Sequence, residues 1–276
     1  MKIIFLGTPN YLDPIIQALD ENFNLIKTIR STLAFQPRVG KLNLEGLQPD
    51  LLVVASFGKI IPQEILKIPR LGAINIHPSK LPLYRGPSPI QSQIIDGVTQ
   101  SAISFILMDE EMDHGPILYQ EPFTISENDT FESLCQKMFG KSAEILPQII
   151  QDLGKSKTTP RLQQHAIATY CNHIKKEDGY FDINNPPKPT ALDKIIRAYY
   201  PWPTAWTKWN GRIVKFLPNI HVIPSAPEES VNTEQISHDV RNDNNKYLIQ
   251  MEGKKAVPIK DFLNGYPDFP QINLIY

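Results

Sequence analysis

Short apolar runs separated by amphipathic segments fill the first half of the chain. Residues 51–55 (LLVVA) form an uninterrupted apolar run, which is typical of a parallel strand buried on both faces. Comparable runs predict further strands, and the predicted strands of this half are 3–6, 24–29, 51–56, 72–77, 102–107 and 116–119. None of these runs approaches the length that a bilayer span requires.

Helical patterns lie between these strands. Apolar residues recur at helical spacing over 89–95 and 130–153. After the first strand, Thr8 is suited to cap a helix and Pro9 to occupy its first position. This alternation predicts an α/β fold built on a doubly wound, mostly parallel sheet.

The ligand site of an open sheet of this kind lies beyond the carboxyl ends of its strands. The residues that follow Ile76 and Leu107 are therefore the places to search for functional side chains. Both positions are followed by clusters of polar residues, which makes them candidates for a single site.

The pattern changes after residue 153. Residues 154–169 are polar and lack periodicity, so they predict a linker, and a helix is predicted around 190–199. We expect three parts: a first domain over 1–153, a linker with a connecting helix over 154–200, and a second domain over 201–276.

Beyond residue 201 the chain contains short β-rich segments. They are predicted at 205–209, 212–217, 221–223, 246–251 and 256–259. Several short strands at close spacing predict a small C-terminal β-barrel of the OB type. The acidic, asparagine-rich stretch 226–245 predicts a loop that interrupts it.

Composition narrows the class of protein. The formal net charge of the 276 residues is -1, which does not fit a protein that binds nucleic acid over its whole surface. The two cysteines, Cys135 and Cys171, lack the spacing of a zinc site, so we expect no metal and no disulfide. We expect a cytoplasmic monomer without membrane contact.

One stretch carries chemistry at the end of a predicted strand. Asn75 and His77 alternate along it, so their side chains point to the same face. Asp113 follows the next strand, and doubly wound geometry can bring it beside His77. An amide donor, an imidazole and a carboxylate suit acyl transfer between amines, because the amide can stabilise an oxyanion while the imidazole moves a proton.

Structural interpretations compete with this one for each residue alone. A single histidine at a strand end is most often structural, Asn75 can form a turn, and Asp113 before Gly115 can form an Asx turn. Trp202 and Trp206 are expected to pack in a core or between domains. Only the combination of Asn75, His77 and Asp113 therefore indicates catalysis.

The combination resembles a known signature. The pattern Asn75-x-His77-x-Ser79-x-Leu81-Pro82-x-Tyr84-Arg85-Gly86, followed by Met112-Asp113-x-Gly115-Pro116-Ile117, resembles that of folate-dependent formyltransferases. The segments 5–9 (FLGTP), 168–170 (ATY), 201–203 (PWP) and 260–265 (KDFLNG) resemble the members of this family that act on charged initiator tRNA. The resemblance spans nearly the whole chain.

The resemblance implies an activity and its site. It assigns catalysis to Asn75, His77 and Asp113, and folate binding to the turn of Ser79, Lys80, Leu81 and Pro82. The implied donor is 10-formyltetrahydrofolate, and the implied acceptor is the methionine amino group of methionyl-initiator-tRNA. Two alternatives stay open: an amino sugar nucleotide or other small amine as acceptor, and a non-catalytic RNA-binding relative.

Two departures from the family pattern affect these expectations. Lys80 stands where the family usually has leucine, and it can extend into solvent or meet the glutamate tail of folate. Residues 30–40 form a short bridge where related enzymes usually carry a longer basic loop. Only Arg30, Arg38 and Lys41 remain nearby, so the way in which tRNA is held differs from the family pattern.

Overall fold

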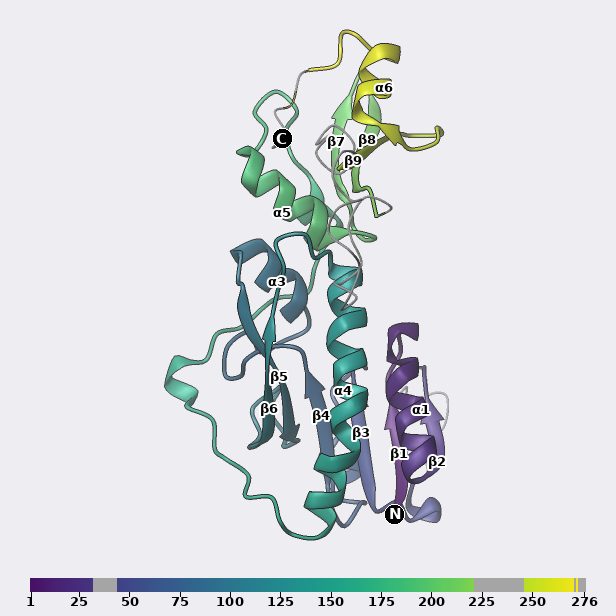
Figure 1. Cartoon of the computed structure of the whole chain (residues 1–276), viewed down its shortest axis with the longest axis vertical. Coiled ribbons are helices and arrows are strands. Elements are labelled where there is room, and N and C mark those ends of the chain that lie inside the picture. The colour runs from purple at the N-terminus through teal and green to yellow at the C-terminus, as the bar shows by residue number, and fades with distance from the viewer. Residues whose placement is uncertain (32–43, 221–245, 271, 273–276) are drawn as a thin grey trace, which may run out of the picture. The chain divides into compact units, whose positions relative to one another are not determined.

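The structure is a computed structural model that describes residues 1–31, 44–220, 246–270 and 272. By their contacts the residues divide into two compact units, and Figure 1 labels many of their helices and strands. The first unit takes residues 1–93, 98–125 and 133–173, and the second takes 94–97, 126–132 and 174–276. The boundaries expected after residues 153 and 200 stay predictions.

A six-stranded sheet forms the centre of the first unit, in the order β2-β1-β3-β4-β5-β6. Its strands are β1 (Lys2–Leu6), β2 (Asn24–Ile29), β3 (Leu51–Ala55), β4 (Ala73–His77), β5 (Gln100–Leu107) and β6 (Ile117–Thr124). Strands β1 to β4 run parallel, and β5 pairs antiparallel with both β4 and β6. The predicted α/β class with a mostly parallel sheet is confirmed.

Strand β3 agrees with its prediction, whereas strand β6 is longer than predicted. Every residue of β3 is buried, as its apolar run predicts. The prediction of 116–119 was wrong in length, because β6 continues to Thr124, which pairs with Gln100. Pro122 lies within it, and an edge strand tolerates a proline because one side of its ladder needs no N–H donor.

The helices of this half are α1 (Asp13–Asn22), α2 (Gln63–Leu66), α3 (Pro89–Asp96) and α4 (Phe131–Gly154). The predicted helix start at Thr8 and Pro9 is wrong. A short 3₁₀ turn, η1 (Asn10–Leu12), comes first, and Pro14 is the proline in the first turn of α1. Thr8 Oγ1 instead donates to the Phe57 carbonyl at 3.4 Å, next to strand β3.

The direction of β5 corrects one step of the sequence argument. Because β5 is antiparallel to β4, Leu107 pairs with Ile74, while His77 pairs with Ser104. The end of β5 therefore lies at the edge of the sheet opposite the end of β4. Asp113 reaches His77 because the loop between β5 and β6 returns along the sheet, and the common carboxyl edge of parallel strands is not the reason.

The second unit packs helices against an antiparallel sheet. Its elements are α5 (Pro189–Tyr199), β7 (Ala205–Trp209), β8 (Arg212–Pro218), β9 (Tyr247–Met251), β10 (Val257–Pro258) and α6 (Ile259–Gly265). The sheet order is β10-β9-β8-β7, and its core includes Leu192, Ile196, Phe216, Ile249 and Phe262. These strands supply the predicted C-terminal β domain.

The second unit departs from the predicted strands near its C-terminal end. The strand predicted at 256–259 is wrong at its end, because only Val257 and Pro258 pair before Ile259 begins α6. Ile259 and Phe262 are both buried, and their spacing suits one face of a helix. The predicted strand at 221–223 and loop at 226–245 lie outside the described residues.

Among the residues that the structure describes, we find no helix with the length and hydropathy of a membrane span.

Candidate active site

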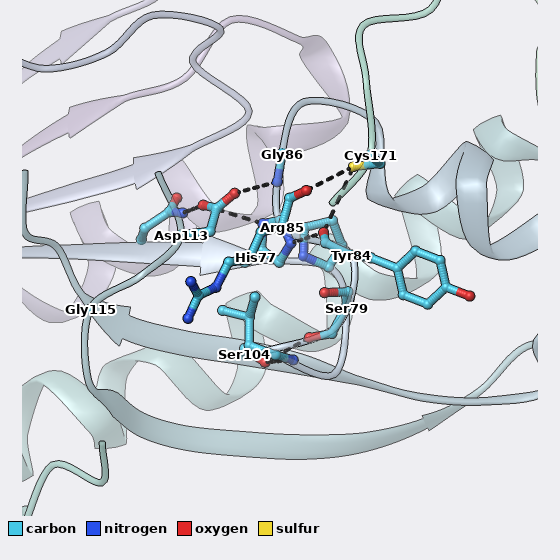
Figure 2. A network of polar contacts seen from close by, with 12 residues as sticks. His77, Ser79, Tyr84, Arg85, Gly86, Ser104, Asp113, Gly115 and Cys171 are labelled. Atoms are coloured by element: carbon cyan, nitrogen blue, oxygen red, sulfur yellow. Dashed lines mark hydrogen bonds and ion pairs between the residues drawn. The ribbon is translucent and has the colours of Figure 1, made fainter. Parts of the chain in front are cut away.

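Asn75 and His77 end strand β4 and share one face of the sheet, as their spacing predicts. Both side chains reach the carboxylate of Asp113, and Figure 2 shows His77 beside it. Asn75 Nδ2 donates to Asp113 Oδ1 at 3.0 Å, and His77 Nδ1 lies 3.5 Å from the same oxygen. The structure therefore brings together the three residues that the sequence singled out.

The Asp113 carboxylate is fixed by more than these two partners. The Gly86 N–H donates to Asp113 Oδ2 at 2.8 Å (Figure 2), and the Asp113 side chain is only 10% exposed. The φ angle of Asp113 is 52°, in the left-handed region that residues other than glycine rarely occupy. Such backbone strain, at a nearly buried carboxylate with several partners, is typical of functional sites.

The two ring nitrogens of His77 have different surroundings. Nε2 lies 2.8 Å from the Tyr84 carbonyl oxygen, which can only accept, so Nε2 carries a proton. In the neutral ring Nδ1 is then the nitrogen with the lone pair, and it faces Asp113. A proton taken up at Nδ1 is stabilised by the carboxylate beside it. The site is thus built to accept and return a proton at one defined atom.

The turn after β4 is held rigidly by buried polar contacts. Ser79 Oγ donates to the Leu83 carbonyl at 2.6 Å, and Ser104 Oγ donates to the Ser79 carbonyl at 2.6 Å. Ser104 Oγ also accepts from the Leu81 N–H at 3.2 Å, and Gln120 Nε2 donates to the Leu81 carbonyl at 2.9 Å. Ser104 and Gln120 were not singled out from the sequence, because nothing in their strands marks them as polar supports.

The predicted folate residues occupy this turn in different ways. Ser79 and Leu81 are buried, Pro82 is partly buried, and Lys80 is exposed. The exposed Lys80 side chain agrees with the outward direction that the sequence allowed. The turn therefore presents an ammonium group on a fixed backbone.

Two glycines let the loops approach one another. A Cβ atom at Gly86, where φ is 120°, would lie 2.3 Å from the Cys171 carbonyl oxygen. A Cβ atom at Gly115 would lie 1.8 Å from the Leu107 carbonyl oxygen. Both contacts are with backbone, so no side chain can move aside, and only glycine fits at either position.

A segment that the sequence predicted as a linker lies directly against the site. Residues 161–171 are paired to β6 at one end, through Arg161 and Ile117. At the other end they form an isolated bridge to Arg85, through hydrogen bonds with Thr169 and Cys171. We call it the 161–171 segment. Its side chains contact the guanidinium of Arg85.

Arg85 is almost completely buried, at 1% exposure, and is surrounded by this segment. Its guanidinium donates to Gln163 Oε1 at 2.7 Å and 3.2 Å, to His165 Nδ1 at 2.8 Å and to Tyr170 Oη at 3.3 Å. Within the described residues, no ion pair of Arg85 is found. Gln163 and His165 were missed from the sequence, since a polar stretch without periodicity gives no signal that separates them from their neighbours.

Cys171 is a free, buried thiol that lies beside Arg85 and Gly86 (Figure 2). Its Sγ donates to the Arg85 carbonyl at 3.3 Å. Burial raises the pKa of this thiol, which keeps it protonated and unreactive near neutral pH. The thiol therefore supports the backbone of the loop and is not a nucleophile.

The outer face of the second unit's sheet carries basic and aromatic side chains. Trp206 packs against Tyr180 with ring centroids 4.9 Å apart, and Lys176 Nζ lies 5.6 Å from the Trp206 ring centroid. Trp206 pairs with Lys215 across the strands, and Lys208 lies two residues along on the same face. The three lysines are exposed, so this face can stack planar groups and attract phosphates.

The predictions for the tryptophans and the basic bridge are changed by these contacts. Trp202 is 57% exposed, so it does not pack in a core, and packing between domains stays a prediction. Trp206 is partly buried, with Tyr180 and Lys176 against its ring. Arg30 bonds to Asn10 and forms an ion pair with Asp13, which offsets its charge. Arg38 and Lys41 lie outside the described residues.

No group of three or more His, Cys, Asp or Glu side chains suited to hold a metal ion is found over the described ranges.

Comparisons with known proteins place this site in context. A family model described as "Formyl transferase" matches residues 22–150, and one described as "Formyl transferase, C-terminal domain" matches residues 173–267. The methionyl-tRNA formyltransferase of Caldanaerobacter subterraneus subsp. tengcongensis is 31% identical over 302 residues, which cover 96% of this chain and 97% of that relative.

Solved structures share the fold. The methionyl-tRNA formyltransferase from Clostridium thermocellum has a TM-score of 0.65 and 19% identity, covering 94% of this chain and 99% of that one. HypX from Aquifex aeolicus, in complex with tetrahydrofolic acid, has a TM-score of 0.69 and 17% identity over 95% of this chain and 47% of that one. At these identities the likeness concerns the fold alone.

Proposed function

This chain belongs to the formyl transferase family, and we propose that it transfers the formyl group of 10-formyltetrahydrofolate to the amino group of methionyl-initiator-tRNA. The observation that carries the proposal is the cluster of Asn75, His77 and Asp113 around one carboxylate oxygen. A relative named methionyl-tRNA formyltransferase that matches this chain over 97% of its own length supports the acceptor. The formylated product would serve the initiation of translation.

His77 moves the proton in the proposed reaction. Its Nε2–H is fixed on the Tyr84 carbonyl, so Nδ1 takes the proton that the attacking amine loses as the new C–N bond forms. The same proton passes to the donor's nitrogen as the old C–N bond breaks, which balances the step. Asp113 stabilises the imidazolium in between and is itself held by Gly86.

Asn75 stabilises the developing oxyanion. Its amide has two N–H groups, and the contact with Asp113 at 3.0 Å uses one of them. The second can donate to the formyl oxygen as negative charge develops there. A single donor of this kind contributes about 3 kcal/mol in comparable sites. Direct transfer is the simpler route, because the nearby Cys171 is a protonated, backbone-bonded thiol.

The turn of Ser79, Lys80, Leu81 and Pro82 is the proposed folate site. Its residues fit the group, because the backbone is fixed next to the trio and Lys80 offers an exposed ammonium to a carboxylate tail. The structure of HypX with tetrahydrofolic acid supports a folate donor for this fold. The folate donor supplies the activated formyl group, and the turn binds the donor so that this group lies beside the trio.

The proposed tRNA contact is the face of the second unit formed by Lys176, Tyr180, Trp206, Lys208 and Lys215, which we call the aromatic–lysine face. Aromatic rings stack on unpaired bases, and lysines bind the phosphates between them. This face compensates for the short bridge near Arg30, whose charge is offset by Asp13. Cytoplasmic location and a monomeric state stay predictions from the sequence.

The alternative acceptor, an amino sugar nucleotide or other small amine, has less support. The chain matches the C-terminal family domain over residues 173–267, and the relative that matches it over 97% of its own length is named methionyl-tRNA formyltransferase. The non-catalytic alternative is opposed by the intact trio, since Asn75, His77 and Asp113 keep both their identity and their contacts.

Formylation of methionyl-tRNA by the purified protein tests the proposal. The protein is incubated with 10-formyltetrahydrofolate and charged initiator tRNA, and formyl-methionine is measured after deacylation. A competing reaction offers an amino sugar nucleotide at the same concentration. Preferred formylation of tRNA, abolished in His77→Ala, is expected. Absence of formyl-methionine at every enzyme concentration would reject the acceptor, and turnover that survives in His77→Ala would reject the mechanism.

A further inference from the structure

Gln163 connects the loop that carries Asp113 to Arg85, in the loop that follows strand β4. Its Nε2 donates to the backbone carbonyls of Asp113 at 2.9 Å and Gly115 at 2.8 Å. Its Oε1 accepts both contacts from Arg85, at 2.7 Å and 3.2 Å. The side chain is 5% exposed, and each polar atom of its amide has a partner. A single amide thus joins the loop after β4 to the loop after β5.

The hydrogen bonds from Gln163 fix the backbone of the loop at Asp113. The residue has a left-handed backbone, and the carbonyls on both sides of His114 are fixed by the same NH₂ group. The direction of the carboxylate depends on this backbone, because the Asp113 side chain has only two rotatable bonds. Holding the backbone therefore aims Oδ1 at Asn75 and His77.

Arg85 strengthens this arrangement through its charge. Over the described residues, its hydrogen-bond partners Gln163, His165 and Tyr170 are neutral when His165 accepts at Nδ1. A buried cation that donates to the Gln163 oxygen polarises the amide and makes its N–H groups better donors. His165 also stacks on His114, with ring centroids 4.0 Å apart, which gives the same loop a second contact with the 161–171 segment.

We propose that Gln163 is a positioning residue for transfer: it fixes the Asp113 loop so that the carboxylate faces His77 and Asn75. The inference rests on the proposed function, since it assigns Gln163 an effect on the step in which Asp113 acts. Gln163 touches neither substrate in this proposal. Its loss therefore lowers kcat while KM for folate and for tRNA changes little.

Gln163→Glu separates the contact with Arg85 from the contacts with the Asp113 loop. The carboxylate keeps the acceptor for Arg85 but loses both N–H donors to the Asp113 loop. A misplacement of about 1 Å can lower a rate about 100-fold, so we expect kcat to fall by about 10- to 100-fold, with each KM within about threefold. Gln164→Glu is the matched control, because it makes the same change at the adjacent exposed residue. We expect its kcat to stay within about twofold of that of the unmodified protein.

A purely structural role predicts a different result. It would lower the melting temperature of Gln163→Glu and leave kcat within about threefold when assayed well below that temperature; that outcome would overturn the proposal. Gln163→Met, which is neutral and of similar length, repeats the test if the carboxylate variant does not fold. Asp113→Asn provides a second criterion, because Gln163→Glu should cost at most about threefold in that background. A full additional loss there would also reject the proposal.

A structure of the Gln163 variant keeps this inference separate from the proposed function. If the unmodified protein formylates no acceptor, the proposed function has failed whatever Gln163 does. The position of the Asp113 carboxylate in the variant structure then tests the positioning role without any activity measurement. We expect the Asp113 carboxylate of Gln163→Glu to leave Gly86 N and Asn75 Nδ2, and a carboxylate that remains in place would refute the positioning role.

Discussion

The proposed catalytic site and the aromatic–lysine face are built on opposite principles. Around Asp113, buried polar groups each contact several others, and Gly86 and Gly115 allow loops to meet at backbone distance. On the second unit, exposed lysines surround a pair of rings and depend little on one another. The first arrangement fixes a geometry for chemistry, whereas the second accumulates weak contacts for binding. Changes should therefore affect kcat in the first region and KM in the second.

The largest effect is expected for Asp113→Asn. The variant loses the charge that stabilises the His77 imidazolium in the transition state, so kcat should fall by about 10³-fold with folate affinity within about twofold. Single-turnover formylation and folate titration measure the two quantities. Glu111→Gln, an exposed position of the same loop, is the control. If Asp113→Asn mainly abolishes folate binding, the role assigned to the carboxylate is wrong.

A glycine pair tests whether rigidity differs between the two units. Gly86→Ala should lower the free energy of unfolding by about 3 kcal/mol, because the new Cβ meets the Cys171 carbonyl and φ is positive. Gly253→Ala, where φ is 75° and the space around the site is open, should cost about 1 kcal/mol. Denaturant unfolding measures both, and equal costs would show that the loops at the site are not tightly packed.

Loss of an aromatic ring should change binding alone. Trp206→Ala removes the ring that contacts Tyr180 and Lys176, and base stacking contributes about 1–3 kcal/mol. We expect KM for methionyl-tRNA to rise about tenfold with kcat and folate KM unchanged. Trp209→Ala is unsuitable as a control because Trp209 is partly buried and packs against the core. Tyr119→Ala, an exposed aromatic residue of the first unit, serves instead. An unchanged KM for Trp206→Ala would remove this face from the proposal.

The smallest effect concerns salt. Three lysines on the aromatic–lysine face should give a slope of about -2 to -3 for the logarithm of tRNA affinity against the logarithm of salt concentration. Lys208→Ala should reduce the magnitude of this slope by about one. Fluorescence titrations across a salt series measure it. A much steeper slope would reveal phosphate contacts beyond this face.

The sequence was informative where local patterns decide structure. The continuous apolar run of β3 and the alternation of Asn75 and His77 depend on neighbours in the chain, and both were confirmed. Errors arose where a longer context prevailed. Pro122 argued against a strand that extends to Thr124. An edge strand tolerates a proline, but the sequence does not show that β6 lies at the edge of the sheet. The composition around Ile259 predicted that the strand continues there. In the structure Ile259 begins helix α6, which buries Ile259 and Phe262 in the core.

What the sequence determined by itself is the set of groups that can perform the chemistry, because Asn75, His77 and Asp113 carry an amide, an imidazole and a carboxylate wherever they lie. The tertiary structure alone decided how they meet. β5 runs against β4, so Asp113 arrives by a returning loop, and Gln163 holds that loop from a segment 50 residues further along the chain. The physical reason is range: side-chain chemistry and strand alternation are local, whereas strand direction and buried hydrogen bonds between distant segments are fixed only when the whole unit packs.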